Sequence, residues 1–211
     1  MIIAIESASS DHSLALASQD GVSFAADSWT GEGRQASELL PRLLVLLARA
    51  GRDLREATAL AIGVGPGSFT GLRVSMSLAK GISLGLRVPV VGIPSLEAWL
   101  EAEPGAAAAT ARAGAQDVYL FTRGAREPRI VAASSLRGLV GASVLAAPSE
   151  LAVAFDLSGT LAPREAAGAV ARLAAARLRQ DPRGDDLARL EPWYLRAPRG
   201  VAASETVSGW P

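Results

Sequence analysis

Cysteine is absent from the 211-residue sequence, and histidine and lysine occur once each, as His12 and Lys80. Without cysteine there are no disulfides, no thiolate-bound metal ions and no cysteine nucleophiles. With one histidine there is no metal site that needs two imidazole ligands, and catalytic triads built on histidine are disfavoured. Most familiar hydrolase mechanisms are therefore excluded before any motif is considered.

An excess of either charge is also missing, because Lys+Arg and Asp+Glu both total 21. A dedicated RNA-binding protein usually carries a basic excess on at least one domain. We therefore expect any contact with RNA to be made mainly by a partner.

Apolar runs are too short to cross a membrane. The most leucine-rich stretch, 39–48, contains Pro41 and Arg42 and falls far short of the roughly 20 residues that a transmembrane helix needs. The first residues carry no basic leader and reach an acid at Glu6, unlike a signal peptide. These features predict a cytoplasmic protein without membrane association.

Hydrophobic periodicity divides the first half of the chain into strands and helices. Three strands are expected at 2–6, 13–17 and 21–29, helices at 37–50, at 70–86 and from about 95, and further strands at 57–64 and 88–92. An antiparallel meander followed by parallel crossover units is the order of one lobe of the actin-like ATPase (ribonuclease H-like) fold.

The second half has weaker signals. The alanine- and glycine-rich stretch 104–115 indicates a boundary, strands are expected at 118–123, 129–133 and 143–147, and a helix from 163 to about 180. We predict an α/β protein of two lobes with mixed five-stranded sheets, the second lobe being reduced. The expected divisions are a first lobe at 1–104, the reduced lobe at 105–198 and a tail at 199–211.

The most informative segment joins the strand at 57–64 to the following helix. Residues 63–73 read Gly-Val-Gly-Pro-Gly-Ser-Phe-Thr-Gly-Leu-Arg. Such a loop lets backbone N–H groups approach an anion at a helix N-terminus, but glycines also serve simply to make a tight turn. The segment is neither a Walker A nor a dinucleotide-binding pattern, and as a generic loop the tight turn is the favoured interpretation.

As a whole string, residues 65–73 resemble the signature of the TsaB (YeaZ) family. Three other segments match that family's pattern, namely the opening Ile-Ala-Ile-acid-Ser, a Leu-Leu-Pro helix and residues 89–97, Pro-Val-Val-Gly-Ile-Pro-Ser-Leu-Glu. A weaker match is 192–196, Pro-Trp-Tyr-Leu-Arg. The resemblance is strong to about residue 100 and faint beyond it.

This resemblance implies an actin-like fold without catalytic apparatus. Family members support the related subunit TsaD, which transfers threonylcarbamoyl to the adenosine beside the anticodon of ANN-decoding tRNAs. The ATPase TsaE completes the assembly, and TsaB alone forms homodimers. The expected function is thus a scaffold that meets tRNA only indirectly. The alternatives are a small-molecule phosphotransferase and a glycoprotease-like hydrolase of the same fold.

At several positions the sequence departs from the family and fold patterns, and these departures argue against ATP hydrolysis. Gln35 stands where other members often have a histidine, and Glu6 replaces the aspartate that holds Mg²⁺-bound phosphate in actin-like ATPases. The second phosphate loop normally begins with an acid, yet the matching region, 111–117, has no acid at the expected position. We expect no catalytic residue, metal or cofactor, and at most a vestigial phosphate loop at Glu6 and Ser7.

Two helices carry the predicted partner interface. The leucines of 37–50 form a wider stripe than one core-facing surface requires, although a helix sandwiched within its own domain would show the same pattern. The helix at 70–86 has two four-spaced rows of small residues on different faces, and such rows allow close helix approach. The interface residues predicted, in agreement with the family, are Leu40, Leu43, Leu44, Leu47, Ser77, Lys80, Gly81, Leu84 and Gly85.

Other polar and aromatic residues favour ordinary roles. His12 is expected in an exposed turn between two strands, and Asp185 and Asp186 in a solvated loop rather than a metal site. Tyr119 and the Trp193-Tyr194 pair are expected in the core or between lobes.

Overall fold

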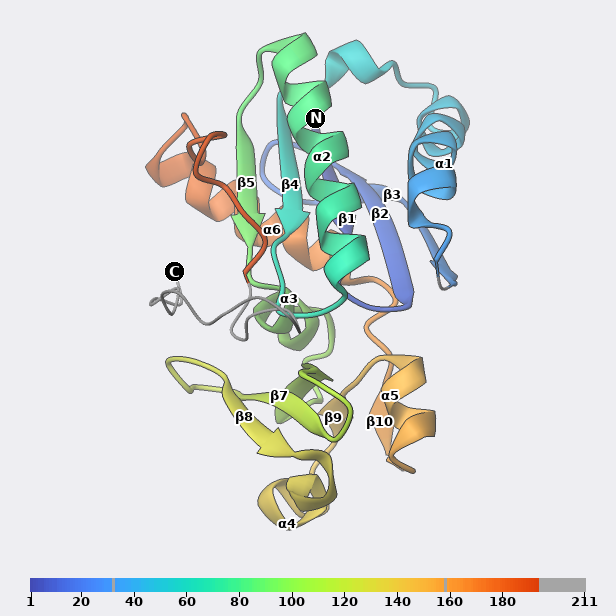
Figure 1. Cartoon of the computed structure of the whole chain (residues 1–211). Helices are drawn as coiled ribbons and strands as arrows, with labels where there is room; N and C mark the ends of the chain where they lie inside the picture. Colours follow the sequence, from blue (N-terminus) through green and yellow to red (C-terminus); the bar gives the residue numbers. More distant parts are fainter. Residues whose placement is uncertain (32, 158, 194–211) are drawn as a thin grey trace.

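The structure, a computed structural model, describes residues 1–31, 33–157 and 159–193 and consists of two lobes (Figure 1). The first sheet contains β1 (Ile2–Glu6), β2 (Asp11–Ala17), β3 (Ser23–Thr30), β4 (Ala59–Gly63) and β5 (Val90–Ile93). Its strand order is β3-β2-β1-β4-β5. The first three strands are antiparallel, and β4 and β5 run parallel to β1.

The second sheet repeats this topology. It contains β6 (Ala108–Arg112), β7 (Asp117–Thr122), β8 (Arg129–Ala132), β9 (Leu145–Ala146) and β10 (Thr160–Leu161), in the order β10-β9-β6-β7-β8. Here β6, β7 and β8 are antiparallel, whereas β9 and β10 continue in parallel and are only 2 residues long each. The predicted actin-like fold with two mixed five-stranded sheets and a reduced second lobe is confirmed.

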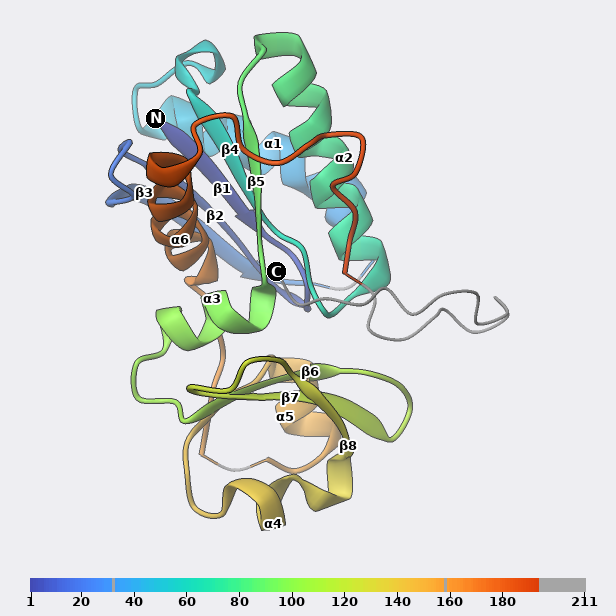
Figure 2. The ribbon, with the colours of Figure 1, turned by 90° about the vertical axis from the view of Figure 1, so that its left-hand side faces the viewer.

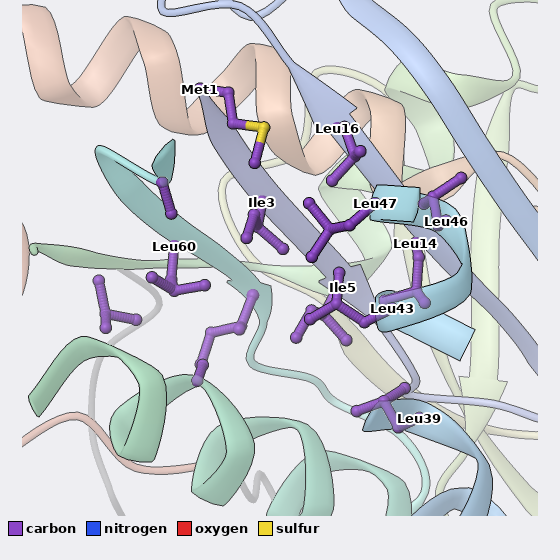
Figure 3. Packing of buried hydrophobic residues seen from close by; sticks show 14 of the residues in the cluster. Met1, Ile3, Ile5, Leu14, Leu16, Leu39, Leu43, Leu46, Leu47 and Leu60 are labelled. Atoms are coloured by element: carbon purple, nitrogen blue, oxygen red, sulfur yellow. The ribbon is translucent and has the colours of Figure 1, made fainter. Parts of the chain in front are cut away.

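Side-chain alternation along the strands of the first sheet separates two apolar layers. Ile3 and Ile5 face one core with the buried leucines of α1 (Gln35–Arg49), and Figure 3 shows these side chains meeting. α2 (Phe69–Leu86) packs beside α1 on the same face. Ile2 and Ala4 face the opposite layer, which is covered by α6 (Ala166–Gln180) (Figure 2).

The layer under α6 is rich in alanine. Five alanines of α6 and the alanines of β1, β2 and β4 share one buried cluster. Because alanine side chains are short, the helix axis can approach the sheet closely and still exclude water. α6 therefore belongs to the packing of the first sheet, although its sequence falls in the range 105–198. The lobe boundaries at 104, 198 and 199 stay predictions, and the tail lies outside the described residues.

After α6 the chain returns across the edge of β5. The Asp185 N–H donates to Val90 O (2.8 Å), the Gly92 N–H donates to the Asp185 carboxylate (2.7 Å), and the Trp193 N–H donates to Val64 O (2.7 Å). We call residues 185–193 the C-terminal strap. It satisfies backbone groups that an edge strand would otherwise expose.

Short helices complete the structure. α3 (Ser95–Ala102) lies between the lobes, and α4 (Leu136–Val140) and α5 (Ser149–Ala154) flank the second sheet (Figures 1 and 2). Two 3-10 turns occur at Leu54–Glu56 and Ala133–Ser135. Among the described residues, none of these helices is long and apolar enough to cross a membrane.

Candidate functional site

The glycines of the 63–73 loop pack against the turn that follows β1, at Ser7 and Ala8. A Cβ on Gly71 would overlap the carbonyl oxygen of Ser7, and a Cβ on Gly67 would overlap that of Ala8. The Ser68 N–H donates to Ala8 O (2.5 Å), and the Ser7 hydroxyl donates to Gly71 O (2.8 Å). The loop therefore packs against the turn after β1, and this contact already engages the Ser68 N–H.

Ser68 also starts α2. Its hydroxyl accepts from the Gly71 N–H (3.2 Å), which satisfies one of the N–H groups left open at a helix N-terminus. Gly65 has φ +100, a conformation that glycine adopts without steric penalty. The tight-turn interpretation thus accounts for the glycines without a ligand.

Glu6 is fully buried at the end of β1. One carboxylate oxygen accepts from the Ala8 N–H (2.7 Å), and the other, Oε2, has no hydrogen-bond partner among the described residues. Burial raises the pKa of Glu6 to about 7, and the Ala8 N–H, the nearby Ser95 hydroxyl and the Ser7 N–H offset only part of that effect. Because the carboxyl of Glu6 is fully buried, it is not presented to a ligand in solvent.

A cavity of about 550 Å³ lies in the cleft between the lobes. It is lined by the turn after β1, the start of α2, the β6–β7 turn and the start of α5, including Ser9, Ser68, Thr70, Arg112 and Glu150. Neither Glu6 nor Ser7 lines it. Among the described residues there is also no cluster of three His, Cys, Asp or Glu side chains able to hold a metal ion.

A carboxylate of the second lobe, that of Glu150, is hydrogen-bonded to the turn after β1 beside this cavity. Glu150 accepts from the Ser10 N–H (3.3 Å) and, through a short hydrogen bond, from the Ser10 hydroxyl. In the opposite direction, Asp11 accepts from the Ser149 N–H (2.7 Å) and the Ser149 hydroxyl (3.0 Å). We call these reciprocal contacts the interlobe latch. Because of these contacts, the N–H and hydroxyl of Ser10 already donate to Glu150 and are not available to a bound anion.

His12 does not lie in an exposed turn, so that prediction was wrong. It is a residue of β2 and is 1% exposed. Its Nε2 lies 2.8 Å from Gly31 O, and its ring packs against Trp29 with centroids 5.3 Å apart. Burial lowers the pKa of the imidazole, which is therefore a neutral core residue.

The two four-spaced rows on α2 have different environments. Gly71, Ser75, Ala79 and Ser83 are buried against the protein's own sheet and first turn. Ser77, Gly81 and Gly85 are exposed, and a Cβ on Gly81 or Gly85 would meet nothing within 4 Å. Packing within the chain therefore explains the first row and not the second.

The leucines of α1 divide in the same way. Leu43 and Leu47 are 0% and 3% exposed and belong to the core. Their prediction as interface residues was wrong, because they lie between α1 and the sheet and cannot contact a partner. Leu40 and Leu44 are 40% and 48% exposed. On α2, Leu84 is 70% exposed and Lys80 partly so.

We call the accessible set the α1–α2 face. Its members are Leu40, Leu44, Val45, Ser77, Lys80, Gly81, Leu84 and Gly85. Val45, which is 49% exposed, was missed because sequence periodicity gives the width of an apolar stripe but not its centre. The role of this face as an interface stays a prediction.

The latch residues Asp11, Ser149 and Glu150 were also missed. Ser149 lies 138 residues from Asp11, and no local pattern links the two positions. Of the remaining predicted residues, Tyr119 is buried as expected, and Asp185 anchors the C-terminal strap and pairs with Arg177 (2.7 Å). Tyr194 and the side chain of Gln35 lie outside the described part of the structure.

The chain is similar in sequence to proteins named for the formation of threonylcarbamoyladenosine on tRNA. Residues 33–133 match the family model TsaD, described as tRNA N6-adenosine threonylcarbamoyltransferase. The tRNA threonylcarbamoyladenosine biosynthesis protein TsaB of Escherichia coli (strain K12) is 36% identical over 95 residues, which is 45% of this chain and 40% of that protein. The protein of the same name from Haemophilus influenzae is 44% identical over 64 residues, 30% of this chain and 27% of that protein. The matched region spans less than half the length of these curated relatives.

Solved structures extend the likeness over both lobes. YeaZ from Pseudomonas aeruginosa superimposes with a TM-score of 0.70 at 22% identity, covering 92% of this chain and 99% of that one. Another solved structure, described as an uncharacterized protein with similarity to peptidase YeaZ from P. aeruginosa, gives a TM-score of 0.73 at 23% identity with the same coverage. At these identities the likeness establishes the fold alone.

Proposed function

Because the chain is similar to TsaB (YeaZ) proteins in sequence and in fold, we propose that it is a member of that family and a non-catalytic partner subunit in the formation of N6-threonylcarbamoyladenosine on tRNA. It supports a TsaD-like catalytic subunit in the cytoplasm and meets a TsaE-like ATPase and ANN-decoding tRNA through that complex. Alone, it pairs with a second copy. The single observation that carries the scaffold role is the α1–α2 face.

Glycines at 81 and 85 weaken an isolated helix. Gly81, in the interior of α2, costs about 0.5–1 kcal/mol relative to alanine, and Gly85, in the last turn, costs less. No packing within the described chain requires either position to lack a side chain. A helix from another subunit could approach closely over this row and bury the neighbouring leucines. The predicted interface residues that are accessible, Leu40, Leu44, Ser77, Lys80, Gly81, Leu84 and Gly85, would form that contact.

Features of the cleft support the absence of catalysis. Glu6 is buried away from the cavity, and the Ser10 donors are occupied by Glu150. A phosphotransferase would need an acid facing the cleft to hold a metal-bound phosphate. The turn after β1 offers no such acid, and Glu150, the acid that lines the cavity, already accepts from Ser10. The glycoprotease alternative has no histidine, cysteine or lysine in the described cavity lining.

The test is co-purification with the TsaD-like subunit of the same organism. Gly81→Arg should abolish the complex while leaving the fold intact, because the side chain enters open space on the α1–α2 face. Gly81→Gln adds bulk without charge and should act in the same direction. Gly138→Arg is the matched control, since Gly138 is also an exposed helical glycine with nothing within 4 Å, but on α4 of the other lobe.

The functional readout is the N6-threonylcarbamoyladenosine content of tRNA in cells depleted of the native protein. Wild type and Gly138→Arg should restore the modification, and Gly81→Arg should not. Normal complex formation by Gly81→Arg would place the interface elsewhere. Absence of any complex with the wild-type chain would remove the proposed function itself.

A further inference from the structure

Charge is concentrated on the two helices of the α1–α2 face. From the N-cap of α1 to its end, and from the N-cap of α2 to its C-cap, the basic residues are Arg34, Arg42, Arg49, Arg73, Lys80 and Arg87. The only acid in those two segments is Glu38. The whole chain, by contrast, has 21 residues of each sign. The two helices together thus carry a net positive charge in a chain that is neutral as a whole.

Most of this charge is not compensated within the described chain. Arg42 pairs with Asp27 (3.1 Å) and Glu38 (3.8 Å), and Arg73 lies over the Phe69 ring. Among the described residues, Arg34, Arg49, Lys80 and Arg87 have no ion pair. A partner that covers this surface must therefore either neutralise these cations or be repelled by them.

On α2, the basic residues Arg73 and Lys80 alternate with Ser77 and Leu84, a small and an apolar residue. Arg73, Ser77, Lys80 and Leu84 are spaced by four, three and four positions, which places them along one stripe of the helix. Arg87 follows at the C-cap. A helix packed along this stripe would meet small, basic and apolar side chains in turn, so the same partner must satisfy all three.

We infer that the α1–α2 face is built for a protein surface that combines apolar side chains with carboxylates, in preference to a second copy of this chain. This inference rests on the proposed function, and it defines the chemistry of the subunit that binds there. The apolar residues would bury Leu40, Leu44 and Leu84, and the carboxylates would lie opposite Lys80 and Arg87.

The same charges weaken self-association without preventing it. In a two-fold dimer each copy offers the same patch, so the basic stripe of one copy lies near that of the other. A nucleic acid would satisfy the cations but would leave Leu40, Leu44 and Leu84 without an apolar surface to bury against. A mixed acidic and apolar protein surface satisfies both.

The two kinds of complex should therefore respond oppositely to salt. Screening is weak at about 50 mM salt and strong at about 500 mM. Raising the salt should weaken binding to the TsaD-like subunit and strengthen self-association. Binding would be followed by calorimetry with purified full-length chains, and self-association by sedimentation equilibrium.

The variant that tests the charge pattern is Lys80→Gln combined with Arg87→Gln. Its affinity for the catalytic subunit should fall roughly tenfold at low salt and little at high salt, since exposed ion pairs each contribute modestly. Its self-association should increase. The matched control is Arg126→Gln with Arg129→Gln, which removes the same charge from exposed residues of the second lobe and should change neither quantity.

Each other outcome overturns the inference in a distinguishable way. A complex that forms but ignores both salt and the Lys80/Arg87 substitutions would leave the proposed function standing and refute the acidic partner. Equal salt dependence of both complexes would refute the preference over a second copy. Direct tRNA binding by the wild-type chain that is lost in the Lys80/Arg87 variant would assign the face to nucleic acid instead.

Discussion

Replacing Glu6 with glutamine tests whether this buried carboxylate destabilises the folded protein at neutral pH. Burial raises the pKa of Glu6 from 4.5 to about 7, and no charged side chain contributes to that shift. Between these two pH values the folded protein therefore binds the proton more strongly than the unfolded chain does. The free energy of unfolding must then fall as pH rises through this window.

The magnitude follows from the shift. One pKa unit corresponds to about 1.36 kcal/mol, so the ionised carboxylate destabilises the folded state by about 3 kcal/mol above the folded pKa. Glutamine has nearly the same shape but stays neutral, and its amide oxygen can still accept from the Ala8 N–H. The stability difference between Glu6→Gln and wild type should thus be about 3 kcal/mol larger at pH 8 than at pH 4.5, in favour of the variant.

Urea denaturation followed by tryptophan fluorescence across this pH range provides the measurement. His12 acts with the opposite sign, because its lowered pKa makes stability fall as pH drops below the usual imidazole pKa of 6.5. Since His12 is present in both proteins, its contribution cancels in the difference. Glu127→Gln, which removes an exposed carboxylate, is the control. Parallel pH profiles for wild type and Glu6→Gln would refute the reasoning.

Other substitutions test the remaining contacts. Gly71→Ala should lower the unfolding free energy by at least about 3 kcal/mol because its Cβ overlaps Ser7 O, whereas Gly81→Ala should raise it by about 0.5–1 kcal/mol because it enters open space; thermal and urea unfolding compare the two. Asp11→Ala should cost about 1–2 kcal/mol, since it removes the acceptor for the Ser149 N–H at the start of α5 and for the Thr30 and Ser149 hydroxyls, and chemical denaturation measures the loss. Glu150→Ala should free the Ser10 donors and give measurable inorganic phosphate binding by calorimetry, and no gain would show that another group excludes the anion.

Much of the first lobe could be predicted because its signals are local. The apolar run of Ile2–Glu6 indicates a buried strand, the leucine spacing of 37–50 reflects which side of the helix faces the core, and both elements formed as expected. In α2 the two small-residue rows were separable from sequence. Only the structure assigns one row to the sheet and the other to solvent.

The failures arise where distant residues decide the outcome. β6 lies in the alanine-rich stretch that was expected to be a boundary, and alanine has little strand propensity of its own. It forms a strand because Ala109 and Ala111 are buried beneath α3 and beside β7. Likewise His12 is polar in sequence, but Gly31 O and Trp29, both far along the chain, provide its buried environment.

The second lobe lies in the sequence between α3 and α6, so the elements of the first lobe are not synthesised one after another. The sheet of the first lobe is complete at β5, yet one of its faces stays open until α6 emerges and its edge until the C-terminal strap arrives. The second lobe is, in effect, an insertion that is synthesised in between. During translation the nascent first lobe therefore exposes the alanine-lined face and a bare strand edge, and its final closure depends on long-range contacts that form slowly. A chain truncated before residue 166 would keep the α1–α2 face in sequence but lose the layer that supports the sheet beneath it.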